Sequence, residues 1–252
     1  MKAMVLAAGL GTRLRPLTDR RPKALVEVAG HTLLEITLVR LRSFGVREVI
    51  INVHHFAEMI ADYLRARGDF GMKIELSHED DLLLDTGGGL KKAAHFFLDT
   101  PDEPFLLHNV DVISTIDLGC MVQAHRESRA LATLAVQRRE TARYLLFDER
   151  HELCGRRAGT DGPVEMARTA EQTEALAFAG IHVISPRLLT QMTEEGAFSI
   201  IDTYLRLASA GERIVAFRAD KYYWRDVGRL ESLQQAAQDA RRSPALFDID
   251  FR

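Results

Sequence analysis

The sequence predicts an α/β fold with a doubly wound, mainly parallel sheet. Three observations lead to this class. In the first half of the chain, short apolar runs of strand length alternate with longer segments whose apolar residues recur every three or four positions. Glycines close two of the longer segments, as they do at helix ends. This alternation is typical of right-handed crossovers between parallel strands, whose ligands bind beyond the carboxyl ends of the strands.

The first strand is predicted over residues 3–8 (AMVLAA), because a continuous apolar run suits a strand buried on both faces. A helix is predicted over residues 33–45, where leucines form one face and Gly45 ends the segment. The same two patterns predict the other elements of the first half: strands over residues 48–53, 72–77, 104–112 and 131–137, and helices over residues 56–68, 89–97 and 117–128.

The alternation breaks over residues 138–176, which are rich in charges and punctuated by glycines. Hairpin strands at an edge of the sheet suit this composition, as a small insertion. Beyond it the pattern predicts strands over residues 175–185, 213–220 and 221–227, and helices over residues 186–192, 199–210 and 229–242. We therefore expect one domain over residues 1–252, with a tail over residues 243–252 that packs on the body or on a partner.

The composition excludes several classes of function. The 252 residues are 46% hydrophobic and 27% charged, as in an ordinary globular domain. A net charge of -3 without a long basic run argues against a nucleic-acid partner. No apolar segment approaches the ~20 residues that cross a bilayer, and no signal peptide is evident, so we expect a cytoplasmic protein without a membrane partner. Cys120 and Cys154 lack ligand-like spacing and are expected to be reduced.

The first predicted strand runs directly into the loop GLGTRLRP. Gly9 and Gly11 let the backbone N–H groups of this loop approach a ligand such as a phosphate. The dinucleotide pattern G-x-G-x-x-G fails because Leu14 stands at its third glycine, which excludes a nicotinamide oxidoreductase. A Walker A loop fails too, because Arg15 stands at its lysine position.

Two cations accompany this loop. Arg13 lies within it, and Lys23 follows Pro22, whose ring restricts the backbone and gives the lysine a fixed place. An arginine can grip two oxygens at once, whereas a lysine acts as a point charge. Together with the glycines, these cations suit the phosphates of a nucleoside triphosphate.

Two aspartates stand at the ends of predicted strands. Asp111 closes an apolar run, and Asp226 follows an aromatic run. Reactions of nucleoside triphosphates usually need Mg²⁺, which proteins bind through one or two carboxylates. An aspartate at a strand end is also a common turn or cap residue, so position alone leaves both roles open.

The motifs taken together resemble one family. LAAGLGTRLRPLTDRRPKALVEVAG near the start, followed by DTGGGL, HNVDV, FAGIHVIS and WRDVGRLESL, resembles the signature of the sugar-1-phosphate nucleotidyltransferases. The resemblance covers about residues 1–240 and is weakest over residues 138–176. It implies a Rossmann-like, GT-A-type nucleotidyltransferase core with a β-hairpin insertion on the sugar side. It also implies a Mg²⁺-dependent reaction of a nucleoside triphosphate with a sugar 1-phosphate, releasing pyrophosphate.

The resemblance also implies roles for individual positions. Asp111 and Asp226 match the metal ligands, although Val110 replaces the glycine that usually precedes the first of them. The insertion lacks a clear Glu-Lys pair for sugar hydroxyls, and Glu165 is the nearest candidate. The implied residues are Arg13 and Lys23 for catalysis, Leu6, Ala8, Gly9, Gly11, Thr12, Arg13 and Gly88 for the nucleotide, and Asn109, Glu165 and Gly180 for the sugar phosphate.

The substrates are less sharply indicated. The short chain and the motifs TGGG and FAGIHVIS look most like enzymes that use UTP and N-acetylmuramate 1-phosphate. Guanylyltransferases for mannose or heptose 1-phosphate are the alternative. A catalytically silent regulatory protein that binds a nucleotide-sugar is a further alternative, and we expect a monomer or a homodimer.

Overall fold

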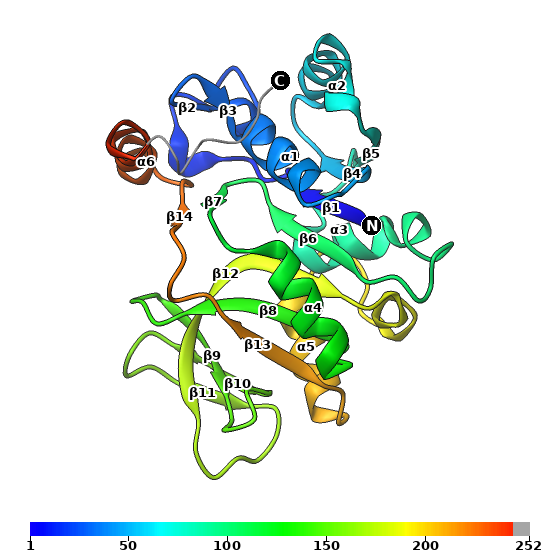
Figure 1. Ribbon diagram of the computed structural model, residues 1–252, viewed down its shortest axis with the longest axis vertical. Coiled ribbons are helices and arrows are strands. Elements are labelled where there is room, and N and C mark those ends of the chain that lie inside the picture. Colours follow the sequence, from blue (N-terminus) through cyan, green and yellow to red (C-terminus); the bar gives the residue numbers. More distant parts are fainter. Residues whose placement is uncertain (244–252) are drawn as a thin grey trace.

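The computed structural model describes residues 1–243, which form a central mixed sheet with helices on both faces (Figure 1). In this part of the chain the main sheet has ten strands, ordered β11-β10-β9-β12-β6-β1-β4-β5, with β8 and β13 joined through β12. Its strands are β1 (Lys2–Leu6), β4 (Glu48–Val53), β5 (Lys73–His78), β6 (Phe105–Asn109), β8 (Ala132–Gln137), β9 (Arg143–Phe147), β10 (Leu153–Ala158), β11 (Val164–Met166), β12 (Glu174–Ile184) and β13 (Ile214–Arg218).

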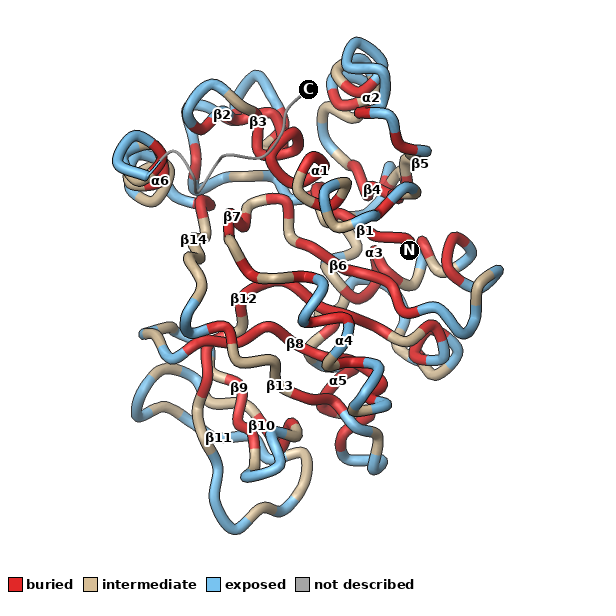
Figure 2. The backbone as a smooth tube through the Cα atoms, in the orientation of Figure 1, coloured by how far each residue is buried: buried red, intermediate tan, exposed pale blue. Residues whose placement is uncertain are grey.

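The first half of the chain supplies the parallel part of the sheet. β1 pairs in parallel with β4 and β6, and β4 pairs in parallel with β5. Along β1 the side chains alternate between two hydrophobic cores, with Ala3 and Val5 in one and Met4 in the other. Figure 2 shows the central strands as buried. The continuous apolar run at the start of the chain therefore follows from burial on both faces.

Helices cover both faces of the sheet. α1, α2, α4 and α6 contribute to one core, whereas α3 and α5 contribute to the other. Among the described residues, no helix has the length and apolar character needed to span a membrane. The bounds are α1 (Leu33–Ser43), α2 (Ala57–Ala66), α3 (Asp85–Lys92), α4 (Leu118–Ser128), α5 (Ile200–Ser209) and α6 (Leu230–Arg242).

The second half of the chain reverses the strand direction. β12 is antiparallel to β6, β8 and β9, and β10 is antiparallel to β9 and β11. β9, β10 and β11 lie at the end of the sheet opposite β5 (Figure 1). The predicted α/β class with a doubly wound sheet is confirmed, with its antiparallel pairs gathered around β12 and the edge strands. Except for Ser243, the predicted tail lies outside the described residues.

Several predicted elements differ in detail. The run predicted as one strand over residues 104–112 divides into β6 and β7 (Val112–Ser114), because β7 leaves the main sheet to pair with β14 (Trp224–Asp226). Residues 186–192 form a short 3-10 segment, Pro186–Gln191. A two-stranded ribbon of β2 (Glu27–Val28) and β3 (His31–Thr32) was not predicted.

The helix predicted over residues 89–97 begins earlier, so three glycines lie inside α3. Each of them makes a close approach. A Cβ on Gly87 would lie 2.3 Å from the Phe198 ring, and a Cβ on Gly88 would lie 2.3 Å from the Gly196 carbonyl oxygen. These glycines therefore allow α3 to pack closely on the segment that precedes α5.

Two buried histidines on neighbouring strands predict that stability depends on pH. Burial lowers the pKa of His108 to about 4 and that of His182 to about 3, from a usual value near 6.5. Below pH 6.5 the unfolded chain therefore binds protons that the folded chain does not. Each histidine should remove up to ~1.4 kcal/mol of stability per pH unit, until the pH approaches its folded pKa.

Burial lowers the pKa of a third histidine, His125 in α4, to about 4 as well. We expect the free energy of unfolding, measured by urea titration, to fall by up to roughly 6 kcal/mol between pH 7 and pH 5. The His182 ring nitrogen lies 2.8 Å from the Tyr204 hydroxyl, a contact that glutamine can partly replace. His182→Gln should therefore fold and show about two-thirds of this fall, because His108 and His125 remain. Equal stability at the two pH values would contradict the assignment.

Candidate active site

The glycine loop packs against the segment that carries Lys23. Gly11 has a φ of 64°, and a Cβ there would lie 2.9 Å from Thr18 Cγ2 and 3.1 Å from Lys23 Cβ. The Thr18 hydroxyl donates a hydrogen bond to the Gly11 carbonyl at 2.9 Å. Gly9 is exposed, with nothing within 4 Å of the position of a Cβ. The loop therefore holds the Cβ end of the Lys23 side chain in place, and the backbone at Gly9 stays exposed.

The two predicted metal ligands are brought together by the ribbon of β7 and β14. In this antiparallel pair, Asp226 lies opposite Val112, the residue after Asp111. The backbone N–H of Val227 donates to the Asp111 carbonyl at 2.9 Å. Two carboxylates that are distant in the chain therefore lie side by side. Val110 is buried and is not among the described residues with positive φ, so its backbone is ordinary.

Cations and carboxylates converge beside Gly228. A Cβ on this glycine would lie 2.8 Å from Asp226 Oδ1, 2.9 Å from Arg13 Nη2 and 3.2 Å from Asp111 Oδ2. Lys23 Nζ donates to Asp111 Oδ2, and this ion pair is largely shielded from solvent. All four predicted groups therefore surround one small space.

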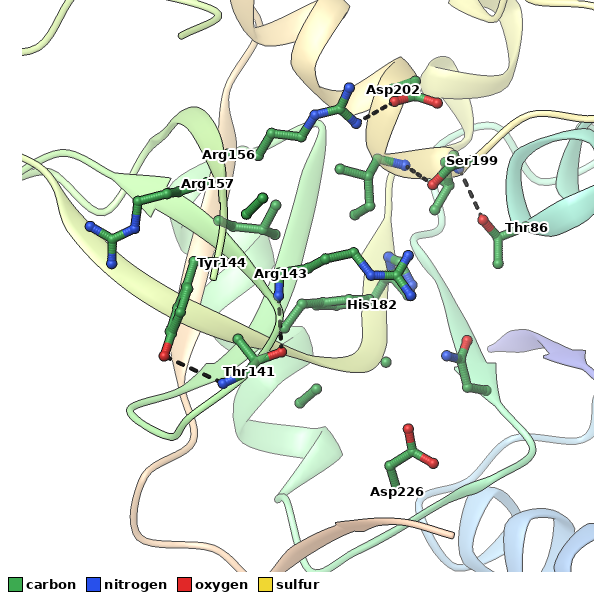
Figure 3. A pocket seen from close by; sticks show the side chains of 18 of the residues that line it. Thr86, Thr141, Arg143, Tyr144, Arg156, Arg157, His182, Ser199, Asp202 and Asp226 are labelled. Atoms are coloured by element: carbon green, nitrogen blue, oxygen red, sulfur yellow. Dashed lines mark hydrogen bonds and ion pairs between the residues drawn. The ribbon is translucent and has the colours of Figure 1, made fainter. Parts of the chain in front are cut away.

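This space lies where two cavities meet. Asp85, Thr86, Asn109 and Asp111 line both of them. The smaller cavity, of about 440 Å³, is also lined by the predicted nucleotide residues Leu6, Ala8 and Gly9 and by Lys23. The larger cavity, of about 740 Å³, is also lined by Glu165, Gly180 and Asp226 (Figure 3).

Four predicted nucleotide residues are not among the described residues that line the two cavities, although one of them, Arg13, reaches the space beside Gly228. Thr12 is exposed at the start of the 3-10 turn Thr12–Leu14, and neither it nor Gly11 is among the described residues that line the cavities. Gly88 is buried inside α3 and is likewise absent from both cavity walls. Its contact with Gly196 supplies a packing reason for the glycine, and its role toward a nucleotide remains a prediction.

A buried polar pair at the smaller cavity was missed by the sequence analysis. Asn52 Oδ1 accepts from the Ala7 N–H at 2.7 Å, and its amide donates to Glu79 Oε1 at 2.7 Å. Glu79 Oε2 in turn accepts from the Leu84 N–H at 2.8 Å. The pair ties the ends of β1 and β4 to the start of α3. The sequence feature that could have revealed this pair is Asn52, a polar residue at the carboxyl end of an otherwise apolar strand.

The wall of the larger cavity near Asp226 is built from aromatic and cationic groups. The Arg139 guanidinium lies 3.7 Å from the centre of the Trp224 ring and donates to the Phe178 carbonyl at 2.6 Å. Burial lowers the pKa of Arg139, and the nearby charge of Asp226 partly offsets this. Sequence analysis missed Arg139, which lies where the alternation of strands and helices breaks.

Asn109 and Gly180, which were both predicted to bind the sugar phosphate, lie in contact with each other. Gly180 has a φ of 74°, and a Cβ there would lie 2.9 Å from Asn109 Nδ2. Asn109 Oδ1 is buried and has no hydrogen-bond partner among the described residues. Glu165 lines the cavity, but its carboxylate is paired with Arg156 at 2.7 Å.

The carboxylates suit a hard cation that takes few protein ligands. Within the described residues, no group of three or more His, Cys, Asp or Glu side chains could hold a metal ion. Asp111 and Asp226 nevertheless present oxygens to the same small space beside Gly228. One or two carboxylates are what Mg²⁺ commonly takes from a protein when phosphates supply further ligands.

The fold and the site define a class of protein: an α/β protein in which cations and carboxylates gather between two adjoining cavities. Residues 2–146 match a family model described as nucleotidyl transferase. The chain is 34% identical over 247 residues to N-acetylmuramate alpha-1-phosphate uridylyltransferase from Caulobacter vibrioides, covering 96% of this chain and 97% of the relative. The chain belongs to the nucleotidyl transferase family.

Two further comparisons cover different shares of the chain. A stretch of 141 residues is 38% identical to mannose-1-phosphate guanylyltransferase catalytic subunit beta from Danio rerio, covering 56% of this chain and 39% of the relative. The crystal structure of HddC from Yersinia pseudotuberculosis superposes with a TM-score of 0.74 at 21% identity, covering 94% of this chain and 98% of that one. The second comparison supports the fold.

Proposed function

We propose that this enzyme transfers a uridylyl group from UTP to N-acetylmuramate 1-phosphate, giving a nucleotide-sugar and pyrophosphate. The observation that carries the reaction is the convergence of Arg13, Lys23, Asp111 and Asp226 between two cavities. The choice of substrates is supported by the Caulobacter vibrioides relative, which matches over almost its whole length.

In the proposed reaction a phosphate oxygen of the sugar 1-phosphate attacks the α-phosphorus, and the bond from that phosphorus to pyrophosphate breaks. The triphosphate occupies the smaller cavity, beside the open backbone of Gly9, and the sugar occupies the larger one. Lys23 offsets the repulsion between the two anions that must meet. Arg13 stabilises the negative charge that develops on the leaving pyrophosphate.

We propose that Asp111 and Asp226 hold Mg²⁺. When bound, this ion neutralises charge on the phosphates as the leaving group departs. Lys23 pairs with Asp111, so it also lowers the repulsion between the two neighbouring carboxylates.

The space beside Gly228 provides a test of the metal proposal. In Gly228→Ala the new methyl would lie within 3 Å of Asp226 Oδ1 and of Arg13 Nη2, so both groups must shift. Gly228 has no positive φ, so the variant should fold normally. We expect kcat to fall about 10- to 100-fold and the Mg²⁺ concentration for half-maximal activity to rise.

The matched control is Gly119→Ala in α4, where a Cβ would lie 3.2 Å from Asp117 Oδ1 and far from the cavities. This variant should keep wild-type activity and metal dependence. Unchanged metal dependence in Gly228→Ala would argue against a metal ion between the carboxylates.

The proposed function is tested by a matrix of nucleoside triphosphates against sugar 1-phosphates, read by pyrophosphate release. UTP with N-acetylmuramate 1-phosphate should give the highest kcat/KM, and release should require Mg²⁺. A preference for GTP with mannose 1-phosphate would instead support the guanylyltransferase alternative, which the match to the Danio rerio protein favours. No release with any pair would support a regulatory protein, against which the convergence of all four site residues argues.

A further inference from the structure

One arginine in the wall of the larger cavity has no side-chain partner among the residues that the structure describes. Arg143 is the exposed first residue of β9, and its side chain extends across the cavity toward His182 (Figure 3). Arg157, which also lines the cavity, extends in the opposite direction, beyond Tyr144. In the antiparallel pair with β10, Arg143 lies opposite Ala158, and Arg157 lies opposite Tyr144. Because side chains alternate between the faces of a strand, Arg143 and Arg157 are directed to different sides.

The neighbouring arginines are already engaged. Arg156 pairs with Glu165 at 2.7 Å and with Asp202 at 2.6 Å, and Arg139 is held by Trp224 and the Phe178 carbonyl. Arg157 donates to the Gly159 carbonyl at 3.2 Å and lies over the Tyr144 ring. For Arg143 the structure gives one hydrogen bond, from its backbone N–H to Thr141. Within residues 1–243 its guanidinium therefore has no hydrogen-bond or ion-pair partner.

The negative charges of the reacting phosphates are offset by cations in another part of the site. Arg13 and Lys23 lie beside the carboxylates at the junction of the two cavities, where the phosphates must meet. A further guanidinium in the sugar cavity is suited to a second anionic group, on the sugar itself. A planar guanidinium binds a carboxylate through two parallel hydrogen bonds.

We propose that Arg143 binds a carboxylate substituent of the sugar and thereby selects acidic sugar 1-phosphates over neutral ones. This inference rests on the proposed function, because it assigns the larger cavity to the sugar. The lactyl ether of N-acetylmuramate carries such a carboxylate, which N-acetylglucosamine lacks. Arg143 is thus a specificity residue of the sugar cavity.

The test compares N-acetylmuramate 1-phosphate with N-acetylglucosamine 1-phosphate in wild type, Arg143→Ala and Arg143→Lys. In Arg143→Ala, kcat/KM for the acidic sugar should fall about 10- to 100-fold, while kcat/KM for the neutral sugar should change less than about twofold. Arg143→Lys should be intermediate, because an ammonium lacks the two-pronged geometry. Calorimetric titration of both sugar phosphates should show the same difference in affinity without turnover.

The matched control is Arg150→Ala. Arg150 is exposed in the turn between β9 and β10, at the other end of the same hairpin, so the variant removes an equal charge outside the cavity. Its selectivity should equal that of wild type. An equal loss toward both sugars in Arg143→Ala, or no loss, would overturn the role of Arg143 while leaving the proposed function in place. If the wild-type enzyme neither binds nor converts the acidic sugar phosphate, the proposed substrate and this inference both fail.

Discussion

Replacing Lys23 with alanine should lower kcat about 1000-fold. Two phosphate anions ~4 Å apart repel by about 4 kcal/mol at an effective dielectric constant near 20. Each ~1.4 kcal/mol corresponds to a factor of ten in rate. Lys23 is placed to offset this repulsion, because its ammonium contacts Asp111 at the junction of the two cavities. Initial rates of pyrophosphate release at saturating substrates measure the effect.

The variant also leaves Asp111 without its lysine, so thermal unfolding should be recorded beside the rates. Assays well below the unfolding transition separate lost catalysis from lost stability. Arg21→Ala is the matched control, because this exposed cation precedes the same segment and lines neither the smaller nor the larger cavity. A folded Lys23→Ala enzyme that retains more than a tenth of wild-type turnover would rule out the proposed role.

Asp226→Asn should lower kcat about 100-fold or more and should raise the Mg²⁺ concentration needed for half-maximal activity. The substitution keeps the size of the side chain and can keep the hydrogen bond that Asp226 Oδ1 accepts from the Gly228 N–H at 2.7 Å. It removes a charge that faces the space shared with Asp111. The loss of activity on removing a direct metal ligand should exceed the 10- to 100-fold loss that is typical when a residue supporting such a ligand is removed. Activity titrated against Mg²⁺ measures the change.

Asp102→Asn is the matched control for this loss of charge. Asp102 is exposed in the turn before β6, the strand that leads to Asp111, and lies away from both cavities. Its titration with Mg²⁺ should match that of wild type. A wild-type titration for Asp226→Asn would exclude this aspartate as a metal ligand.

Local patterns predicted most of the fold. β1, α1 and β4 follow from hydrophobic periodicity and from glycines at helix ends, since Gly45 does have the positive φ that ends α1. α3 was misplaced because its glycines suggest a loop, whereas they serve close packing against Phe198 and Gly196. Such packing depends on segments more than 100 residues apart, which a local pattern does not contain.

The candidate site was predictable where a motif carries it. Lys23, Asp111 and Asp226 converge as the resemblance implied. The two aspartates are joined by the pairing of β7 with β14, two strands that are far apart in the sequence, and local patterns do not predict such a pairing. Asn52 looked like part of an ordinary strand, because its partner Glu79 lies elsewhere in the sequence. Arg143 was missed because it lies in a segment rich in charged residues. In the sequence, an arginine whose side chain lines a cavity looks the same as one that faces only solvent.

The ribbon of β7 and β14 has a consequence for how the enzyme is made. Asp111 belongs to the first half of the chain, but Asp226 comes after nearly all of the main sheet, and β14 is then tied to α6 through the pairing of Arg225 with Asp239. The lining of the smaller cavity runs from Leu6 to Asp111 and is completed by Ala197, so a nascent chain on the ribosome contains all of it before Asp226 is added. Fragments that stop before residue 224 lack Asp226, so under the proposed function they should bind nucleotide but should not catalyse the reaction. Turnover should begin only after β14 has been synthesised.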